Sequence, residues 1–274
     1  MVDLHVAPDR RFAVWRTIVL ARIRSQLAYR SSFWLNASNS FLLGGLEFIE
    51  IYVLLSVSPV FGGLTLAQAT FVFALSTVGF AGADLVFGQM DSLPTFIRSG
   101  QLESFLTKPL PLLPQLLSSS FQLRRAARMV FGVLALVVSV TQLDVVWTPV
   151  TVALTVVTPV FGMMIFASLF VLAGGCQFWL VNGAEFTNAF VYGGSYASRL
   201  PGGVLLAPIR VFFTFVVPTT ITAYLPALLI LGLDGPPGLP SWLAWFAPLF
   251  AAWSWLLALL VWRAGVRKYT GAGG

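Results

Sequence analysis

Seven long apolar segments limit what this chain can fold into more than any other feature. A helix needs about 20 mostly apolar residues to cross the roughly 30 Å hydrocarbon core of a bilayer. Because a water-soluble fold of this size could not hide so much apolar surface, the sequence excludes a soluble enzyme, a nucleic-acid-binding domain and a disordered chain. The segments are Phe33–Val57, Leu66–Gly88, Met129–Val146, Val150–Ala173, Leu180–Ala197, Val204–Gly232 and Ser241–Trp262.

The basic residues predict which ends of these segments face the cytoplasm. Charged residues make up only 9% of the 274 residues, and loops rich in Lys and Arg stay on the cytoplasmic side. Fourteen of the sixteen basic residues fall before the first segment, between the second and third, or after the last. They are Arg10, Arg11, Arg16, Arg22, Arg24, Arg30, Arg98, Lys108, Arg124, Arg125, Arg128, Arg263, Arg267 and Lys268. Both termini are therefore predicted to be cytoplasmic, and the number of crossings must be even.

We accordingly predict an all-α, polytopic membrane protein with six transmembrane helices in a single domain, residues 1–274. Two assignments give six crossings. In the first, Leu180–Ala197 crosses and Val204–Gly232 is a re-entrant hairpin bent at a central proline, whose arms of about 14 residues are too short to span. In the second, residues 174–203 stay at the cytoplasmic face and Val204–Gly232 crosses as a kinked helix. Arg199 and Arg210 lie inside only in the second, so charge alone favours it.

Residues 10–30 are predicted to form an interfacial helix. Few helix breakers occur there, and apolar residues recur at three- and four-residue spacing, so they would share one face. These residues are Phe12, Trp15, Val19, Ile23 and Leu27. A basic amphipathic helix of this kind can lie on anionic lipid. The alternative is a basic tail that only sets the orientation of the chain.

The cytoplasmic loop over residues 89–128 holds the most informative motif. It reads Arg98-Ser-Gly-Gln-Leu-Glu-Ser-Phe-Leu-Thr-Lys108-Pro-Leu. Ser99 and Gly100 can begin a short helix, and Pro109 prevents its continuation. Leu102, Phe105 and Leu106 give that helix one apolar face. A short amphipathic helix suits docking into a groove on a partner protein, whereas the alternative is a loop that only returns the chain to the bilayer.

This loop resembles that of type-2 ATP-binding-cassette (ABC) permeases, and in particular the small bacterial six-helix permeases that work beside a separate ATPase. Their R-x-G-x-L-x-x-x-L-x-x-P-L pattern matches at Arg98, Gly100, Leu102, Leu106, Pro109 and Leu110. Tyr29-Arg30, the stretch Arg210–Pro218 and the closing Trp262–Tyr269 also fit. The likeness covers nearly the whole chain. One departure is Leu200-Pro201, where that group often has an aromatic residue before the proline.

The resemblance implies a fold and a role. It implies an interface helix over residues 10–30, a coupling helix from Arg98 to Leu106, and a re-entrant extracellular helix pair within 199–240, which supports the first assignment. It also implies the permease subunit of an ATP-driven exporter in the bacterial inner membrane. Two ABC ATPase subunits and a second copy of the permease, or a homologous chain, would complete the transporter. The implied ATPase-coupling residues are Arg98, Gly100, Leu102, Glu103, Phe105 and Leu106. A cavity between apolar helices suits a lipid-like or amphiphilic substrate.

Catalytic and metal-binding patterns are missing from the sequence. Neither Lys108 nor Lys268 lies in a phosphate-binding loop, so ATP and Mg are expected on the partner ATPase. His5 and Cys176 are the only residues of their types, which leaves no triad or clustered metal site built on them. We predict no enzyme activity, cofactor or metal on this chain, and no nucleic-acid partner.

Several acids lie within the apolar segments, and three of them are candidates for function. Glu47 and Glu50 are three residues apart on one helical face, and Asp84 lies late in the second segment. Ionisable groups in a membrane usually face a bundle interior or an aqueous cavity, so these acids are candidates for the translocation path. In the alternative they bond to neighbouring helices, and Asp84 orients the coupling loop. An ion- or proton-coupled secondary transporter that uses these acids is the alternative function.

Overall fold

A computed structural model describes residues 8–57, 62–108, 110–119, 121–180 and 183–269 of the chain. Every regular element within these ranges is a helix, which confirms the predicted all-α fold. His5 and Pro109 lie outside the described residues.

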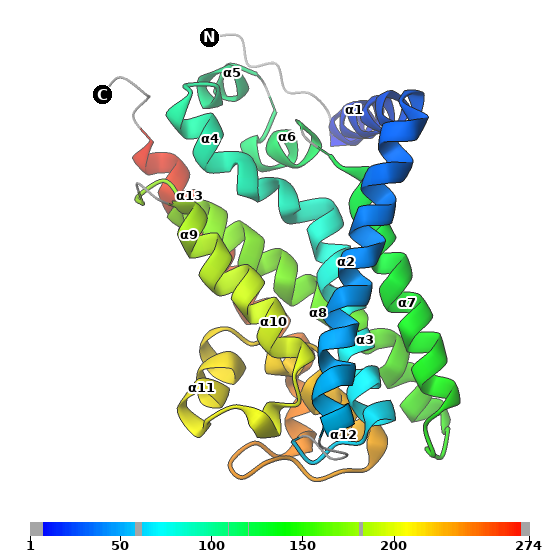
Figure 1. Cartoon of the computed structure of the whole chain (residues 1–274). Coiled ribbons are helices and arrows are strands. Elements are labelled where there is room, and N and C mark those ends of the chain that lie inside the picture. Colours follow the sequence, from blue (N-terminus) through cyan, green and yellow to red (C-terminus); the bar gives the residue numbers. More distant parts are fainter. Residues whose placement is uncertain (1–7, 58–61, 109, 120, 181–182, 270–274) are drawn as a thin grey trace.

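The first helix lies across one end of the molecule, which we call the cap end (Figure 1). This helix, α1 (Pro8–Ala28), is followed by α2 (Arg30–Val57), which runs down the length of the bundle. The third helix, α3 (Leu66–Phe87), returns to the cap end. Its start is fixed by a capping box, because the Thr65 side chain accepts a hydrogen bond from the Gln68 amide and the Gln68 side chain accepts one from the Thr65 amide.

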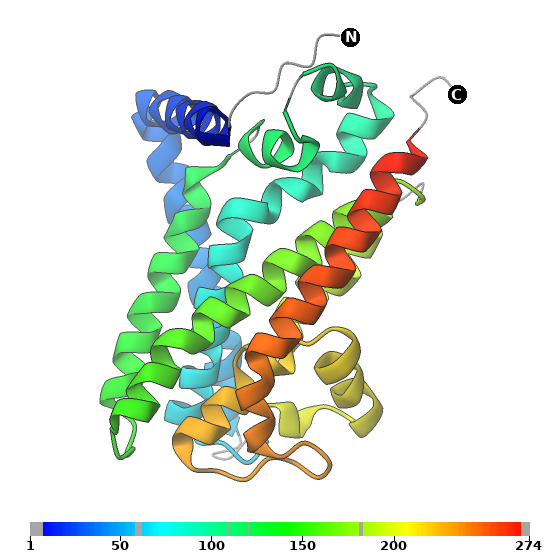
Figure 2. The same cartoon turned by 180° about the vertical axis from the view of Figure 1, so that it is seen from behind.

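Short helices follow α3 and form a cap over this end of the bundle (Figures 1 and 2). A 3₁₀ segment, Gly88–Ser92, leads to α4 (Leu93–Arg98), α5 (Leu102–Leu106) and α6 (Leu112–Ser119). The structure contains the predicted short helix before Pro109, but the helix does not extend back to Arg98 as the family resemblance implies. Arg98 ends α4, and Gly100 adopts a φ of 70°. That left-handed conformation favours glycine and interrupts the helix, so α5 begins only at Leu102.

Three further long helices complete the bundle. After the 3₁₀ segment Leu123–Arg125, α7 (Ala126–Thr141) descends beside α2 and α8 (Pro149–Cys176) returns. The last helix, α13 (Ala247–Lys268), packs along α8 and ends at the cap end. α3 packs on both α7 and α8. Glycines allow the closest approach, since a Cβ atom added at Gly79 would lie 3.3 Å from the Gly162 Cα atom of α8.

Between α8 and α13 the chain forms one tilted rod and then a broken hairpin. The rod consists of α9 (Gly183–Thr187), a π-helical turn (Asn188–Tyr192) and α10 (Gly193–Arg199). It runs from the cap end into the middle of the molecule (Figure 1). At the opposite end lie short pieces, which are the 3₁₀ turn Gly202–Val204, α11 (Ala207–Val211), a π turn (Phe212–Val216), a 3₁₀ turn (Thr220–Thr222), α12 (Tyr224–Leu231) and the 3₁₀ segment Ser241–Phe246.

This arrangement agrees with the first predicted assignment in the break of 204–232 around Pro218, whereas the number of crossings stays a prediction. Residues 183–199 form a continuous rod, whereas 204–232 breaks around Pro218 and stays at the end away from the cap. By length and apolar composition, four helices of the described chain could each cross a membrane, and α7 is shorter, with 16 residues. Those four are Arg30–Val57, Leu66–Arg98, Pro149–Cys176 and Ser241–Lys268.

Burial differs sharply between α2 and α3. Every residue from Ala69 to Asp84 of α3 is buried, whereas α2 buries only Ala37, Gly44, Ile51 and Leu55. Large apolar side chains cover the exposed remainder of α2, including Leu35, Leu42, Leu46, Ile49 and Val53. A soluble protein rarely exposes such a surface, so α2 faces lipid or another membrane helix, and α3 is the central helix of the bundle.

Candidate functional site

The short helix α5 is a rigid part of the cap. Its Leu102 side chain is fully buried, and the Phe105 ring packs 5.5 Å from the Phe96 ring of α4. The Gln115 side-chain amide of α6 donates hydrogen bonds to the carbonyl oxygens of Phe105 (3.0 Å) and Leu110 (2.7 Å). These contacts give hydrogen-bond partners to carbonyl groups at and after the end of α5, and they hold α5 against α6.

The other side of α5 is exposed at the tip of the cap. Glu103, Leu106 and Lys108 lie on the surface, and the Lys108 ammonium stands 5.2 Å from the Phe105 ring centre. Burial and the Glu103 carboxylate raise the pKa of the Tyr269 phenol, which directly follows α13. The predicted coupling residues therefore divide into buried ones that fix α5 and exposed ones that a partner could reach.

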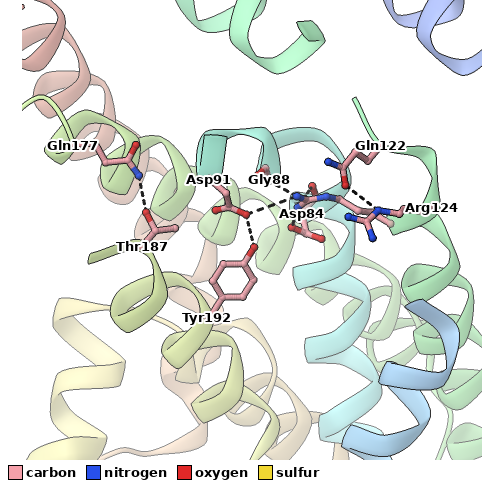
Figure 3. Close-up of polar contacts among 9 residues, drawn as sticks. Asp84, Gly88, Asp91, Gln122, Arg124, Gln177, Thr187 and Tyr192 are labelled. Atoms are coloured by element: carbon pink, nitrogen blue, oxygen red, sulfur yellow. Dashed lines mark hydrogen bonds and ion pairs between the residues drawn. The ribbon is translucent and has the colours of Figure 1, made fainter. Parts of the chain in front are cut away.

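A group that we call the Arg125 cluster comprises Asp84, Asp91, Arg125 and Tyr192, in which Arg125 contacts both acids. Figure 3 shows the Asp84, Asp91 and Tyr192 side chains near one another. The Arg125 guanidinium forms an ion pair with the Asp84 carboxylate of α3. It also donates to the carbonyl oxygens of Asp84 and Gly88, each at 3.3 Å, and lies 3.7 Å from Asp91. The Tyr192 hydroxyl of the π turn donates to Asp91 at 2.5 Å. The cluster thus connects α3, the start of α7 and the tilted rod.

A second group, the Glu47 cluster, joins α2 to the bundle and comprises Glu47, Glu50, Arg128, Tyr196 and Arg199. The Glu47 carboxylate forms ion pairs with Arg128 of α7 and, at 2.8 Å, with Arg199 of α10. The Arg199 side chain is only 7% exposed and also donates to the Ser195 hydroxyl at 2.7 Å. The Tyr196 hydroxyl donates to Glu50 on the next turn of α2. One carboxylate therefore holds two cations from two other helices.

Phe80 of α3 lies between the two clusters. The Arg128 and Arg199 guanidinium carbons lie 5.4 Å and 5.6 Å from the centre of its ring, a cation–π arrangement. The Tyr192 ring of the Arg125 cluster lies 5.8 Å from the same centre. Both clusters also touch the tilted rod, since Tyr192, Tyr196 and Arg199 all belong to it. A continuous line of polar and aromatic contacts thus leads from below the cap to α2.

The structure brings Glu47 and Glu50 together in one cluster and places Asp84 in the other. All three acids have partners, as the alternative interpretation expected, and their role in a translocation path stays a prediction. The sequence predicts Arg125 and Arg128 as loop charges before an apolar segment that begins at Met129. Helix α7 instead begins at Ala126, so Arg128 lies inside the helix and pairs with Glu47. Arg125 lies just before α7, as expected, and its side chain pairs with Asp84.

Sequence reasoning missed Tyr192, Tyr196 and Arg199 as partners of the acids. The signal available was that Arg199 stands outside the three basic groups, in a segment that also carries two tyrosines. A charge that the orientation rule does not explain indicates a buried partner. Within the described residues, no group of His, Cys, Asp and Glu is arranged to hold a metal ion.

Residues 41–273 match the family model described as ABC-2 family transporter protein, which covers most of the chain. The chain therefore belongs to the ABC-2 family of transporter proteins, and it is a membrane protein of the permease type. Membership implies the permease subunit of an ABC transporter, associated with an ATP-binding subunit. Searches of curated proteins and of solved structures found no match.

Proposed function

We propose that this chain is the permease subunit of an ATP-driven exporter of a lipid-like or amphiphilic molecule, with the cap as the surface that contacts the ATPase. The observation that carries the proposal is the exposed face of α5 at the tip of the cap, on a helix held by the buried Leu102 and by hydrogen bonds from Gln115. Two permease chains and two ATPase subunits would form the transporter, in a bacterial cytoplasmic membrane. ATP and Mg belong to the ATPase subunits.

Charge supports a cytoplasmic cap. Arg22, Arg24, Arg263, Arg267 and Lys268 are exposed, and they lie on α1 and the last turns of α13, at the same end as α5. Basic residues at membrane ends favour the cytoplasmic side. An ATPase that uses cytoplasmic ATP would meet α5 on this side, and a movement of α5 would pass directly through α4 into the central helix α3.

The surroundings of the Glu47 cluster support an amphiphilic substrate. Glu50 and Tyr196 are exposed beside apolar side chains of α2, such as Ile49 and Val53, which are each 51% exposed. An amphiphile moving along this face would meet apolar surface for its tail and a single polar cluster for its head group. A second permease chain packed on this face would enclose that route.

Co-purification tests the contact with the ATPase. The tagged chain is co-expressed with candidate ABC ATPases, and the wild type is expected to retain one of them. Glu103→Arg and Leu106→Asp change the exposed face of α5 and should reduce the retained ATPase by about tenfold or more if they lie at the centre of the interface. Asp234→Arg is the matched control, because Asp234 is an exposed acid at the opposite end.

Two results would contradict the proposal. One is equal retention of the ATPase by Glu103→Arg, Leu106→Asp and Asp234→Arg, which would remove α5 from the interface. The other is transport in vesicles that an ion gradient drives without nucleotide, which would favour the secondary transporter.

A further inference from the structure

An apolar groove of about 540 Å³ opens between the cap and the spanning helices. Its lining includes Ile18 of α1, Leu113 and Leu117 of α6, Phe87 at the end of α3 and Trp255 of α13. This volume is in the range of sites that hold small ligands. The groove does not include residues of either charge cluster.

The walls of the groove are ordered and almost entirely apolar. Phe87 and Trp255 pack edge to face, with ring centres 5.7 Å apart. The two polar residues of the lining, Gln115 and Ser118, direct their hydrogen bonds to backbone carbonyls of the cap. The donor groups of both polar side chains are thus used within the cap, and the rest of the lining is apolar, which suits a hydrocarbon chain better than a polar head group.

The position of α1 and its positive charge indicate which kind of lipid head group would fit at the edge of the groove. The groove has α1 and α6 of the cap on one side and the spanning helices α3 and α13 on the other. This boundary between cap and spanning helices corresponds to the level of the lipid head groups. Arg22 follows Ile18 by one helical turn on the same face. It is exposed, and residues 16–28 of α1 include no acid. A cation one turn from an apolar groove complements a lipid that carries a negative head group.

We propose that this groove holds one acyl chain of an anionic phospholipid of the bilayer, whose phosphate is bound by Arg22. Such a lipid would bridge α1, α6 and α13, and it would tie the cap to the spanning helices. The proposal concerns a resident lipid of the membrane and does not depend on what the transporter exports.

Photolabelling tests it on the full chain in nanodiscs. The probe is phosphatidylglycerol with a diazirine on one acyl chain, and the labelled peptides are identified by mass spectrometry. We expect label concentrated on α6 and on α13 around Trp255, and a weaker signal from the same probe with a phosphatidylcholine head group. Arg22→Gln should reduce the phosphatidylglycerol label in the groove about fivefold, as expected for loss of one interfacial cation.

Two variants separate the site from general lipid contact. Arg24→Gln removes an exposed arginine that points away from the face of Ile18, so it should leave the labelling unchanged. Leu117→Trp fills the groove and should abolish the label there with either head group. Label spread evenly over all lipid-facing helices, or equal effects of Arg22→Gln and Arg24→Gln, would overturn the proposal. Because Arg22 is exposed, Arg22→Gln still decides the matter if Leu117→Trp does not fold.

Discussion

The Arg125 cluster and the Glu47 cluster have central residues of opposite charge. In the first, one cation is surrounded by two acids and two backbone carbonyls. In the second, one acid holds two cations. Loss of Arg125 would leave carboxylates, and a buried carboxylate can become neutral by binding a proton. Loss of Glu47 would leave arginines, which keep their charge. The Glu47 cluster should therefore be the more sensitive of the two to loss of its central residue.

The largest effect is expected for Glu47→Ala. This variant removes the carboxylate from both arginines. Arg128 keeps the Phe80 ring, and Arg199 keeps that ring and the Ser195 hydroxyl. An unpaired buried charge costs about 3–5 kcal/mol, and here two would remain. The free energy of unfolding, measured in bicelles, should fall by at least that amount.

A double variant serves as the control. Glu47→Ala combined with Arg128→Met removes one cation together with the acid, and it should recover part of the lost free energy of unfolding. An unchanged free energy in Glu47→Ala, or additive losses in the double variant, would show that the pairing contributes little.

A smaller effect is expected for Arg125→Met. It removes an ion pair and two hydrogen bonds to carbonyls, and charged hydrogen bonds of this kind contribute about 1.5–3 kcal/mol. Asp84 and Asp91 lose their cation and can then take up protons, so the loss of stability should shrink as the pH is lowered toward about 5. Thermal unfolding at several pH values measures this. If Glu47→Ala recovers equally at low pH, the contrast between the clusters is wrong.

The smallest effect is expected for Tyr196→Phe. Tyr196 is 47% exposed and its hydroxyl donates to Glu50, itself exposed. Because water can replace this bond, the free energy of unfolding should change by about 0.5–1 kcal/mol. A loss as large as that of Glu47→Ala would mean that a second chain buries this face, and cross-linking at position 196 would then detect the partner.

The sequence predicted the bundle better than it predicted the clusters. Apolar segments place α2, α3, α8 and α13 correctly, since each must cover the thickness of the bilayer. The turn at Gly100 could have been read from the sequence, because glycine commonly follows the last turn of a helix. The partners of Glu47 could not, since Arg128 and Arg199 are far away in the chain and meet it only when three helices pack. The basic residues near α7 were assigned by an orientation rule that does not consider burial.

The π turn at Asn188–Tyr192 has a consequence for how the two clusters are aligned. A π turn holds one residue more than an α turn, and each residue of an α-helix rotates the next by about 100°. The extra residue therefore sets the angle between Tyr192, which serves one cluster, and Arg199, which serves the other. Deleting one residue there would rotate α10 about its axis and direct the Arg199 side chain away from Glu47. The π turn thus sets the rotation of α10 about its axis, so that one rod contributes side chains to both clusters.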